Sequence, residues 1–151
     1  MCLILDTNSA HHFASPISQD GLKVLDWVEQ KGGCIIYGGQ NADELFNAGT
    51  DMKRLLVTLT RAGRAKRMPD QQVKLETSIV LATGLFRSDD PHIIALARIS
   101  NARVLYSHDT DLHEDFKNLN LLPSPKGTIY QNQTHARLLT HTSLCIGRPK
   151  A

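Results

Sequence analysis

Four acidic residues each follow an apolar segment or begin a helical pattern, namely Asp6, Glu44, Asp90 and Asp109. Carboxylates that lie close together repel one another and raise their own pKa values unless a cation neutralises them. Oxygen ligands of this kind suit Mg²⁺ or Mn²⁺, which keep bound waters and bind substrate phosphates. Such a cation can generate hydroxide and stabilise charge on a phosphoryl group. If the fold brings these residues together, they are candidates for a metal centre that acts on a phosphate ester.

At two of these positions a neighbouring acid could be the ligand instead. Asp43 could replace Glu44, and Asp111 competes with Asp109, which we favour because it follows its apolar segment more directly. Asp90 has a competing role as the N-cap of its own helix, and one oxygen cannot easily serve as both cap and ligand.

Two polar residues stand beside the ligand candidates. Asn8 and Ser107 could orient carboxylate oxygens by hydrogen bonding to them from behind. Asn8, together with Thr7, is equally consistent with an ordinary turn.

The elements that must position these side chains alternate between short apolar segments and helical patterns. Strands are expected at residues 2–5, 34–37 and 103–107, with an edge strand at 126–130. Apolar spacing predicts helices at 18–30, 41–48, 52–60, 71–85, 90–100 and 112–117, and a last helical turn at 136–139. Residues 6–8 and 61–69 are expected to be loops.

This alternation predicts an α/β domain, in which crossover connections create a parallel sheet with helices on both faces. In such sheets ligands bind outside the carboxyl ends of the strands. The four acids would therefore gather at one edge of one sheet.

Length and composition favour a single folded domain. The chain has 151 residues, of which 41% are hydrophobic, enough to bury a core. We expect one domain at residues 1–122 and an extension at 123–151 that packs on it. No run reaches the roughly 18 apolar residues of a membrane span. The N-terminus has no basic region and reaches an acid at Asp6, so it does not resemble a signal peptide, and we expect a cytoplasmic protein.

Positive charge is concentrated in the middle of the chain although the formal net charge is only +2. Residues 53–74 contain seven bases and one acid, Asp70. A protein that separates its charges in this way could bind a polyanion beside an acidic pocket. The alternative is a set of solvated helix and loop surfaces.

Four segments together resemble the PIN-domain nucleases. Residues 3–8 (LILDTN) resemble the family's opening strand, which ends in an acid followed by Thr and Asn. Residues 88–97 (SDDPHIIALA) are similar to the helix that brings an acid over the sheet edge, and residues 104–112 (VLYSHDTDL) to the strand that ends in S/T-x-D-x-D/F. The segment 35–45 resembles the second strand with its acid-leucine pair. The family's Ser or Pro after this strand is replaced by glycines, and the tail beyond Pro123 matches no pattern.

The resemblance implies a metal-dependent endoribonuclease with a parallel sheet of four or five strands. It places Asp6, Glu44, Asp90 and Asp109 on the family's acidic positions, with Asp111 as a fifth candidate ligand for Mg²⁺ or Mn²⁺. Asp90 is preferred to Asp89 because it precedes His92 by two residues. The family includes the VapC-type toxins of toxin–antitoxin pairs and RNA-processing enzymes, so RNA, a protein antitoxin and a second copy of the chain are expected partners.

The bases at the centre of the chain then become candidates for binding the RNA backbone, namely Arg61, Arg64, Lys66 and Arg67. Two other functions stay open. The chain could be an inactive PIN-like module that binds RNA or a protein without cleavage. The pair His108-Asp109 also suggests a His/Asp metal phosphohydrolase, but those enzymes carry the pair on helices and here it follows an expected strand.

Overall fold

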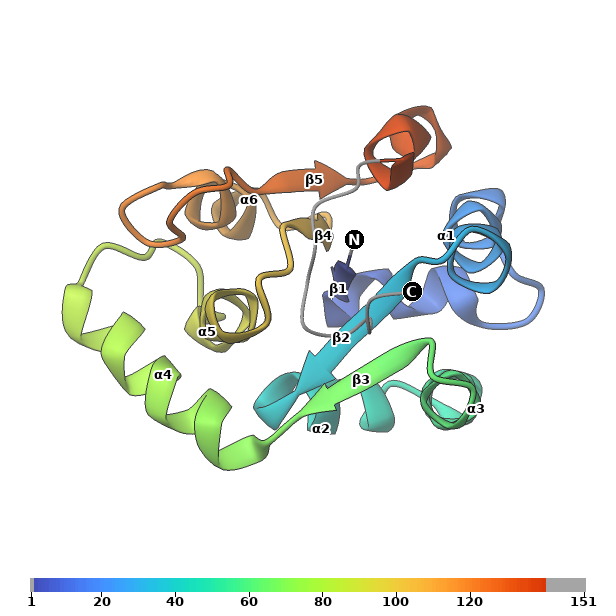
Figure 1. Ribbon diagram of the computed structural model, residues 1–151, viewed down its shortest axis with the longest axis horizontal. Helices are drawn as coiled ribbons and strands as arrows, with labels where there is room; N and C mark the ends of the chain where they lie inside the picture. Colours follow the sequence, from blue (N-terminus) through green and yellow to red (C-terminus); the bar gives the residue numbers. More distant parts are fainter. Residues whose placement is uncertain (1, 141–151) are drawn as a thin grey trace.

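The computed structural model describes residues 2–140. Within them, five strands form one parallel sheet in the order β3-β2-β1-β4-β5 (Figure 1). The strands are β1 (Cys2–Leu5), β2 (Cys34–Gly38), β3 (Ala65–Met68), β4 (Val104–Tyr106) and β5 (Thr128–Tyr130). Because every neighbouring pair is parallel, all five strands end at the same edge of the sheet. The predicted α/β class is confirmed.

Helices cover both faces of the sheet. They are η1 (Thr7–Phe13) and η2 (Gln133–Thr140), both 3₁₀, and α1 (Gln19–Gln30), α2 (Gly39–Asn47), α3 (Thr50–Arg61), α4 (Asp70–Thr83), α5 (Pro91–Ser100) and α6 (Thr110–Lys117). The core between α4, α5, α6 and the sheet is separate from the core that involves η1, α1, α2, α3 and η2. Figure 1 shows this division, with α4, α5 and α6 on one side of the sheet and α1 and α3 on the other.

The central strands form where the sequence is apolar without interruption. All four residues of β1 are buried, with Leu3 and Leu5 in one core and Cys2 and Ile4 in the other. Side chains of a strand alternate between the faces, so a strand covered on both faces must be apolar at every position. The same reasoning accounts for β2 and β4, whose residues are all buried.

Two expected loops are corrected by the structure. Residues 61–69 contain β3, an edge strand in which Ala65 and Met68 are buried while Lys66 and Arg67 are exposed. Charged side chains are common on edge strands because they hinder pairing with another chain, and here they hide the strand pattern. Residues 6–8 likewise do not form a plain loop, because η1 begins at Thr7.

The C-terminal part of the described chain extends the sheet. Strand β5 pairs with β4, and the Tyr130 hydroxyl donates a hydrogen bond of 2.9 Å to the carbonyl of Asp20. The preceding segment is fixed by the buried Arg103, whose guanidinium donates to the carbonyls of Pro123 and Pro125. The rest of the expected extension, residues 141–151, lies outside the described residues.

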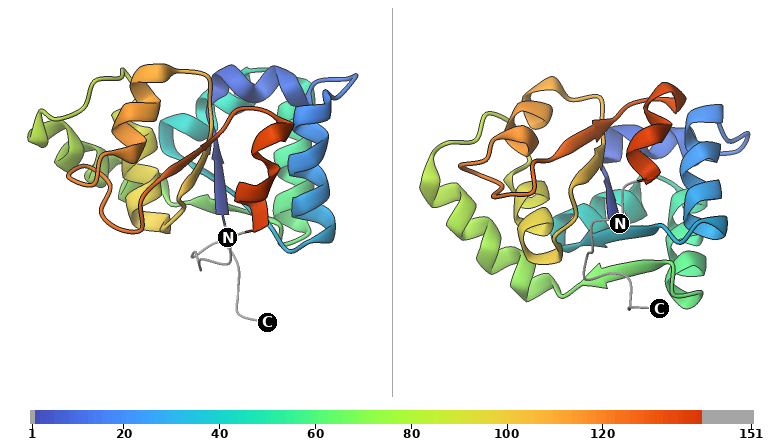
Figure 2. Two further views of the ribbon diagram at one scale, coloured as in Figure 1. Left: turned by 90° about the horizontal axis from the view of Figure 1, so that it is seen from above. Right: turned by 45° about the horizontal axis from the view of Figure 1, so that its top comes forward.

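The edge at which the strands end is the part of the fold that matters for function. In the left view of Figure 2, β1 (dark blue) runs from the N-terminus toward the edge where η1 lies. Helices α2 and α6 begin shortly after β2 and β4, two strands that end at this edge, and α5 begins after the loop that follows α4. Within residues 2–140, none of the helices combines the length and the apolar character that crossing a membrane requires.

Candidate metal centre

Four carboxylates from four elements meet at the carboxyl edge of the sheet. Asp6 follows β1, Glu44 lies on α2, and Asp90 and Asp109 occupy the N-cap positions of α5 and α6. Burial raises the pKa of Asp90 to about 6, and the charges of Asp6, Glu44 and Asp109 contribute to that rise. Charges that act on Asp90 in this way lie close to it, so the fold gathers the acids that the sequence indicated.

Asp6 is the most enclosed member, with 6% of its surface exposed. Burial raises its pKa, and the charges of Asp109 and Glu44 raise it further, whereas a hydrogen bond from Ser107 lowers it. The Ser107 hydroxyl donates to Asp6 Oδ2 at 2.7 Å and accepts from the backbone N–H of Asp109 at 3.1 Å. Ser107 therefore orients one acid and holds the backbone of another.

Asp90 is not committed to capping its helix. Although it occupies the N-cap position of α5, its side chain makes no capping hydrogen bond in the described structure. Its own backbone N–H donates to the Ser88 hydroxyl at 3.2 Å, and Pro91 at the first helical position needs no acceptor. The competition between cap and ligand is thus resolved in favour of a free carboxylate.

Glu44 is held from both sides. Its Oε2 accepts a hydrogen bond of 3.0 Å from the Thr7 hydroxyl, and its Oε1 accepts one of 2.8 Å from the Gln40 side-chain amide. Each carboxylate oxygen has two lone pairs, so these bonds leave room for a cation. The neighbouring Asp43 is exposed and lines a pocket between α2 and α4.

Asp109 and Asp111 lie in different surroundings, which favour Asp109 as the member of the site. Asp109 uses Oδ1 to cap α6, accepting from the backbone N–H groups of Asp111 and Leu112 at 3.0 and 3.3 Å. Asp111 is exposed in the first turn of that helix, and its charge is not among those that raise the pKa of Asp6 or Asp90. Asn8 accepts from the backbone N–H of His108 at 3.3 Å, so it braces the end of β4.

The structure adds a residue that the sequence reasoning did not place in the site. His92 is 2% exposed, and its Nε2 lies 3.7 Å from Glu44 Oε2. Ligand atoms of Glu44, Asp90 and His92 all lie within 4.8 Å of one another. Burial lowers the pKa of His92 against the opposing charges of Glu44 and Asp6. The signal available in the sequence was a histidine two residues after an acid, in the first turn of an otherwise apolar helix.

A buried carboxylate fixes the loop that presents Asp90. Asp115 on α6 is 1% exposed, and its two oxygens accept the backbone N–H groups of Arg87 and Ser88 at 2.8 and 2.9 Å. A bidentate acceptor of this kind restrains the chain immediately before the metal candidate. On the other side, the Asn41 amide donates to the Leu5 carbonyl at 2.8 Å and joins α2 to the end of β1.

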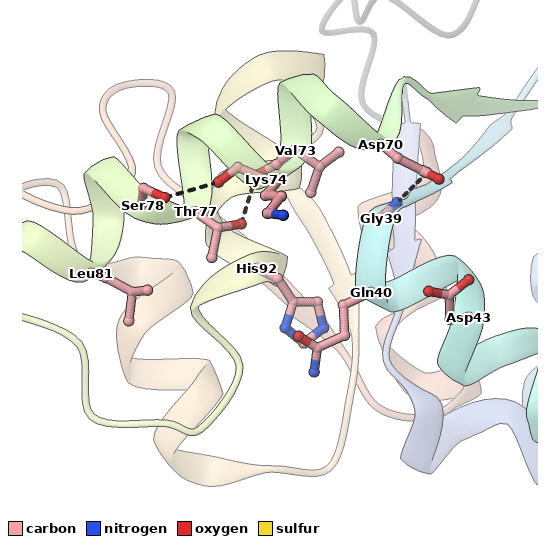
Figure 3. A pocket seen from close by; sticks show the side chains of 10 residues that line it. All are labelled: Gly39, Gln40, Asp43, Asp70, Val73, Lys74, Thr77, Ser78, Leu81 and His92. Atoms are coloured by element: carbon pink, nitrogen blue, oxygen red, sulfur yellow. Dashed lines mark hydrogen bonds between the residues drawn. The ribbon is translucent and has the colours of Figure 1, made fainter.

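A pocket of about 440 Å³ opens between α2 and α4, and its lining includes His92 and Gln40, the residue that donates to Glu44. Figure 3 shows His92 and Gln40 on one side of it and Lys74 and Thr77 of α4 on the other. Val73 gives it part of an apolar wall. A planar group could enter here next to the carboxylates.

Two of the four bases predicted to bind RNA lie before β3, and the other two lie within it. Arg61 ends α3, and the Arg64 side chain donates to the Val28 carbonyl at 2.9 Å, both before the strand begins. Lys66 and Arg67 are exposed on the strand, and the Arg67 guanidinium lies 5.5 Å from the ring of Phe46 on α2. At about 3.3 Å per residue, Arg64 is roughly 13 Å from the carboxyl end of the strand.

The fold resembles that of a protein chain of known structure. A chain in the crystal structure of VapBC2 from Rickettsia felis bound to a DNA fragment from their promoter matches 87% of this chain and 100% of its own length, with a TM-score of 0.55 and 14% identity. No protein-family model matches the chain, and no curated protein matches it significantly in sequence. At this identity the likeness concerns the fold, which is PIN-like, as the sequence motifs indicated.

The burial of Asp6 and Asp90 beside other carboxylates predicts how stability depends on pH. Because the pKa values of Asp6 and Asp90 are raised, the folded protein binds protons more tightly than the unfolded chain between about pH 4 and 6. Without metal, the free energy of unfolding therefore falls as the pH rises through this window. We predict that Asp90→Asn raises the thermal unfolding midpoint in EDTA at neutral pH, and that this gain disappears near about pH 4.

The control is Glu29→Gln, which removes a carboxylate from an exposed position on α1. It should leave the midpoint nearly unchanged at both pH values. An Asp90→Asn variant no more stable than the wild type at neutral pH would contradict the repulsion.

Proposed function

We propose that this protein is a metal-dependent endoribonuclease that hydrolyses RNA phosphodiester bonds at the carboxyl edge of its sheet. The observation that carries the proposal is the convergence of Asp6, Glu44, Asp90 and Asp109 from four separate elements, with the pKa values of two of them raised. An assembly of carboxylates that destabilises the protein at neutral pH is typical of a site selected for function.

The residues present fit a hard divalent cation such as Mg²⁺ or Mn²⁺. Asp90 makes no side-chain capping bond in the described structure, and Asp109 uses only Oδ1 in its cap. A cation bound here would supply an activated water and would balance the charge that develops on the phosphate.

The chain's own side chains would keep the carboxylates aligned during this chemistry. Ser107 holds Asp6, and Thr7 and Gln40 hold the two oxygens of Glu44. Hydrogen bonds from behind a ligand fix its direction, and removing them weakens metal binding by about 10- to 100-fold. The pocket beside His92 would accept a base that flanks the scissile phosphate.

The fold likeness to a VapBC2 chain supports a toxin of a toxin–antitoxin pair as the finer function. A protein antitoxin would then be the natural partner, and a homodimer stays a prediction. The alternative is an inactive PIN-like module that binds RNA or a protein. A His/Asp phosphohydrolase has less support, because the His108 ring contacts the Gln131 carbonyl at 3.1 Å and stacks near His12.

Cleavage assays test the proposal. A fluorescent RNA should be cut in the presence of Mg²⁺ or Mn²⁺ and stay intact in EDTA. Asp6→Asn and Asp90→Asn should each lower the cleavage rate by about a hundredfold or more, because each removes a candidate ligand. Circular dichroism should show that both variants stay folded.

The matched control is Asp89→Asn, which removes the exposed carboxylate directly before Asp90. It should keep near wild-type activity. Full activity of Asp6→Asn and Asp90→Asn under matched metal would show that the site is wrongly assigned, and wild-type protein without metal-dependent cleavage would favour the inactive module.

For RNA binding, we propose that the exposed bases of β3 contact the phosphate backbone. Lys66 and Arg67 are the exposed residues of β3, and Arg67, next to the last residue of the strand, also approaches the helix that carries Glu44. In an Asp6→Asn background, replacing both by Gln should weaken affinity for unrelated RNAs equally. The slope of log affinity against log salt should flatten by roughly 0.7 for each phosphate that the protein no longer neutralises.

Arg61→Gln provides the control because this base belongs to the same charged segment but lies before β3. Its salt slope should match that of the parent. An unchanged slope in the double variant would leave Lys66 and Arg67 as a solvated strand edge.

A further inference from the structure

We infer that His92 supplies a nitrogen ligand to the cation held by Glu44 and Asp90, so that this site prefers Mn²⁺ to Mg²⁺. This inference rests on the proposed function because it assumes the same metal site. It adds which metal ion the site prefers and which residue causes that preference.

The geometry suits coordination. Glu44, Asp90 and His92 each offer one ligand atom, and these three atoms lie within 4.8 Å of one another. The His92 Nε2 is 3.7 Å from Glu44 Oε2. Two ligands bonded to one cation at about 2.0–2.2 Å lie roughly 3–4 Å apart, so a single ion could bond both without a large movement.

Within residues 2–140, no hydrogen bond uses the Nε2 atom of His92. His92 Nε2 is buried and has no hydrogen-bond partner among the described residues. Its distance to Glu44 is too long for a hydrogen bond. Buried polar atoms without partners are rare in folded proteins, and one that faces two carboxylates points to a cation between them.

The position of the ring on α5 supports the same assignment. His92 stands two residues after Asp90, at the end of the helix that faces the acids, and the next five residues of α5 are apolar and buried.

The nitrogen determines which ion is preferred. Mg²⁺ selects an all-oxygen environment with several waters, whereas imidazole suits first-row transition ions. An all-carboxylate site at this edge would discriminate little between Mg²⁺ and Mn²⁺. A mixed site of oxygen and nitrogen ligands would bind Mn²⁺ more tightly, and the preference should depend on His92.

Titration of Mn²⁺ and Mg²⁺ into the metal-free, full-length protein tests the role of His92 without any measurement of activity. By calorimetry, the wild type should bind Mn²⁺ about tenfold or more tightly than Mg²⁺. His92→Gln should lose about tenfold in Mn²⁺ affinity while its Mg²⁺ affinity changes little. His11→Gln, which alters an exposed histidine of η1, is the control and should bind both ions like the wild type.

Pulsed electron paramagnetic resonance of the Mn²⁺-loaded wild type gives a second readout that needs no variant. A directly bonded imidazole should produce nitrogen coupling to the manganese, and His92→Gln should abolish it. Absence of this coupling in the wild type, failure of Mn²⁺ to bind, or equal loss of Mg²⁺ and Mn²⁺ affinity in His92→Gln would each overturn the inference.

RNA cleavage by the wild type is measured separately to distinguish the two proposals. Cleavage without nitrogen coupling would overturn the role of His92 and leave the nuclease assignment standing. Nitrogen coupling without cleavage would support the role of His92 and overturn the nuclease assignment.

Discussion

The gathering of four carboxylates at one partly buried edge of the sheet is the main electrostatic constraint on this fold. Burial, together with the charges of the neighbouring acids, raises the pKa values of Asp6 and Asp90, which costs stability at neutral pH. Two cores, one on each face of the sheet, supply the burial that offsets this cost. Polar side chains next to the acids, such as Ser107, hold the carboxylates in place but cannot cancel their charge. A bound cation can neutralise this charge, and the need for a cation links the fold to the proposed metal-dependent cleavage of RNA.

Much of this arrangement could be predicted from the sequence because β1 and β4 are continuous apolar runs, with Asp6 directly after the first and Asp109 three residues after the second. Burial on both faces of the sheet leaves no polar residue inside β1 or β4, so the acids after them were conspicuous. The N-cap conflict at Asp90 could not be settled in this way, since a cap and a ligand look identical in a sequence. The structure resolved it by placing the carboxylate out of capping contact within the described residues.

Two features were not predicted from the sequence, for physical reasons. β3 was missed because an edge strand exposes one side and Lys66 and Arg67 interrupt its apolar pattern. The segment predicted as one basic loop therefore consists of a helix end, a short turn and a strand, with Arg64 turned toward the Val28 carbonyl. His92 was missed because a histidine in an apolar helix resembles a core residue, and only the approach of α2 brings Glu44 to it.

The central claim is that a divalent cation belongs between the carboxylates, and the most direct measurement is anomalous diffraction from crystals of the protein grown with Mn²⁺. We expect an anomalous peak at the carboxyl edge of the sheet, within bonding distance of oxygens from Asp6, Glu44, Asp90 or Asp109. If the edge is well ordered but shows no peak at saturating Mn²⁺, or if the ion binds only elsewhere on the protein, the assignment of a cation to this site is contradicted.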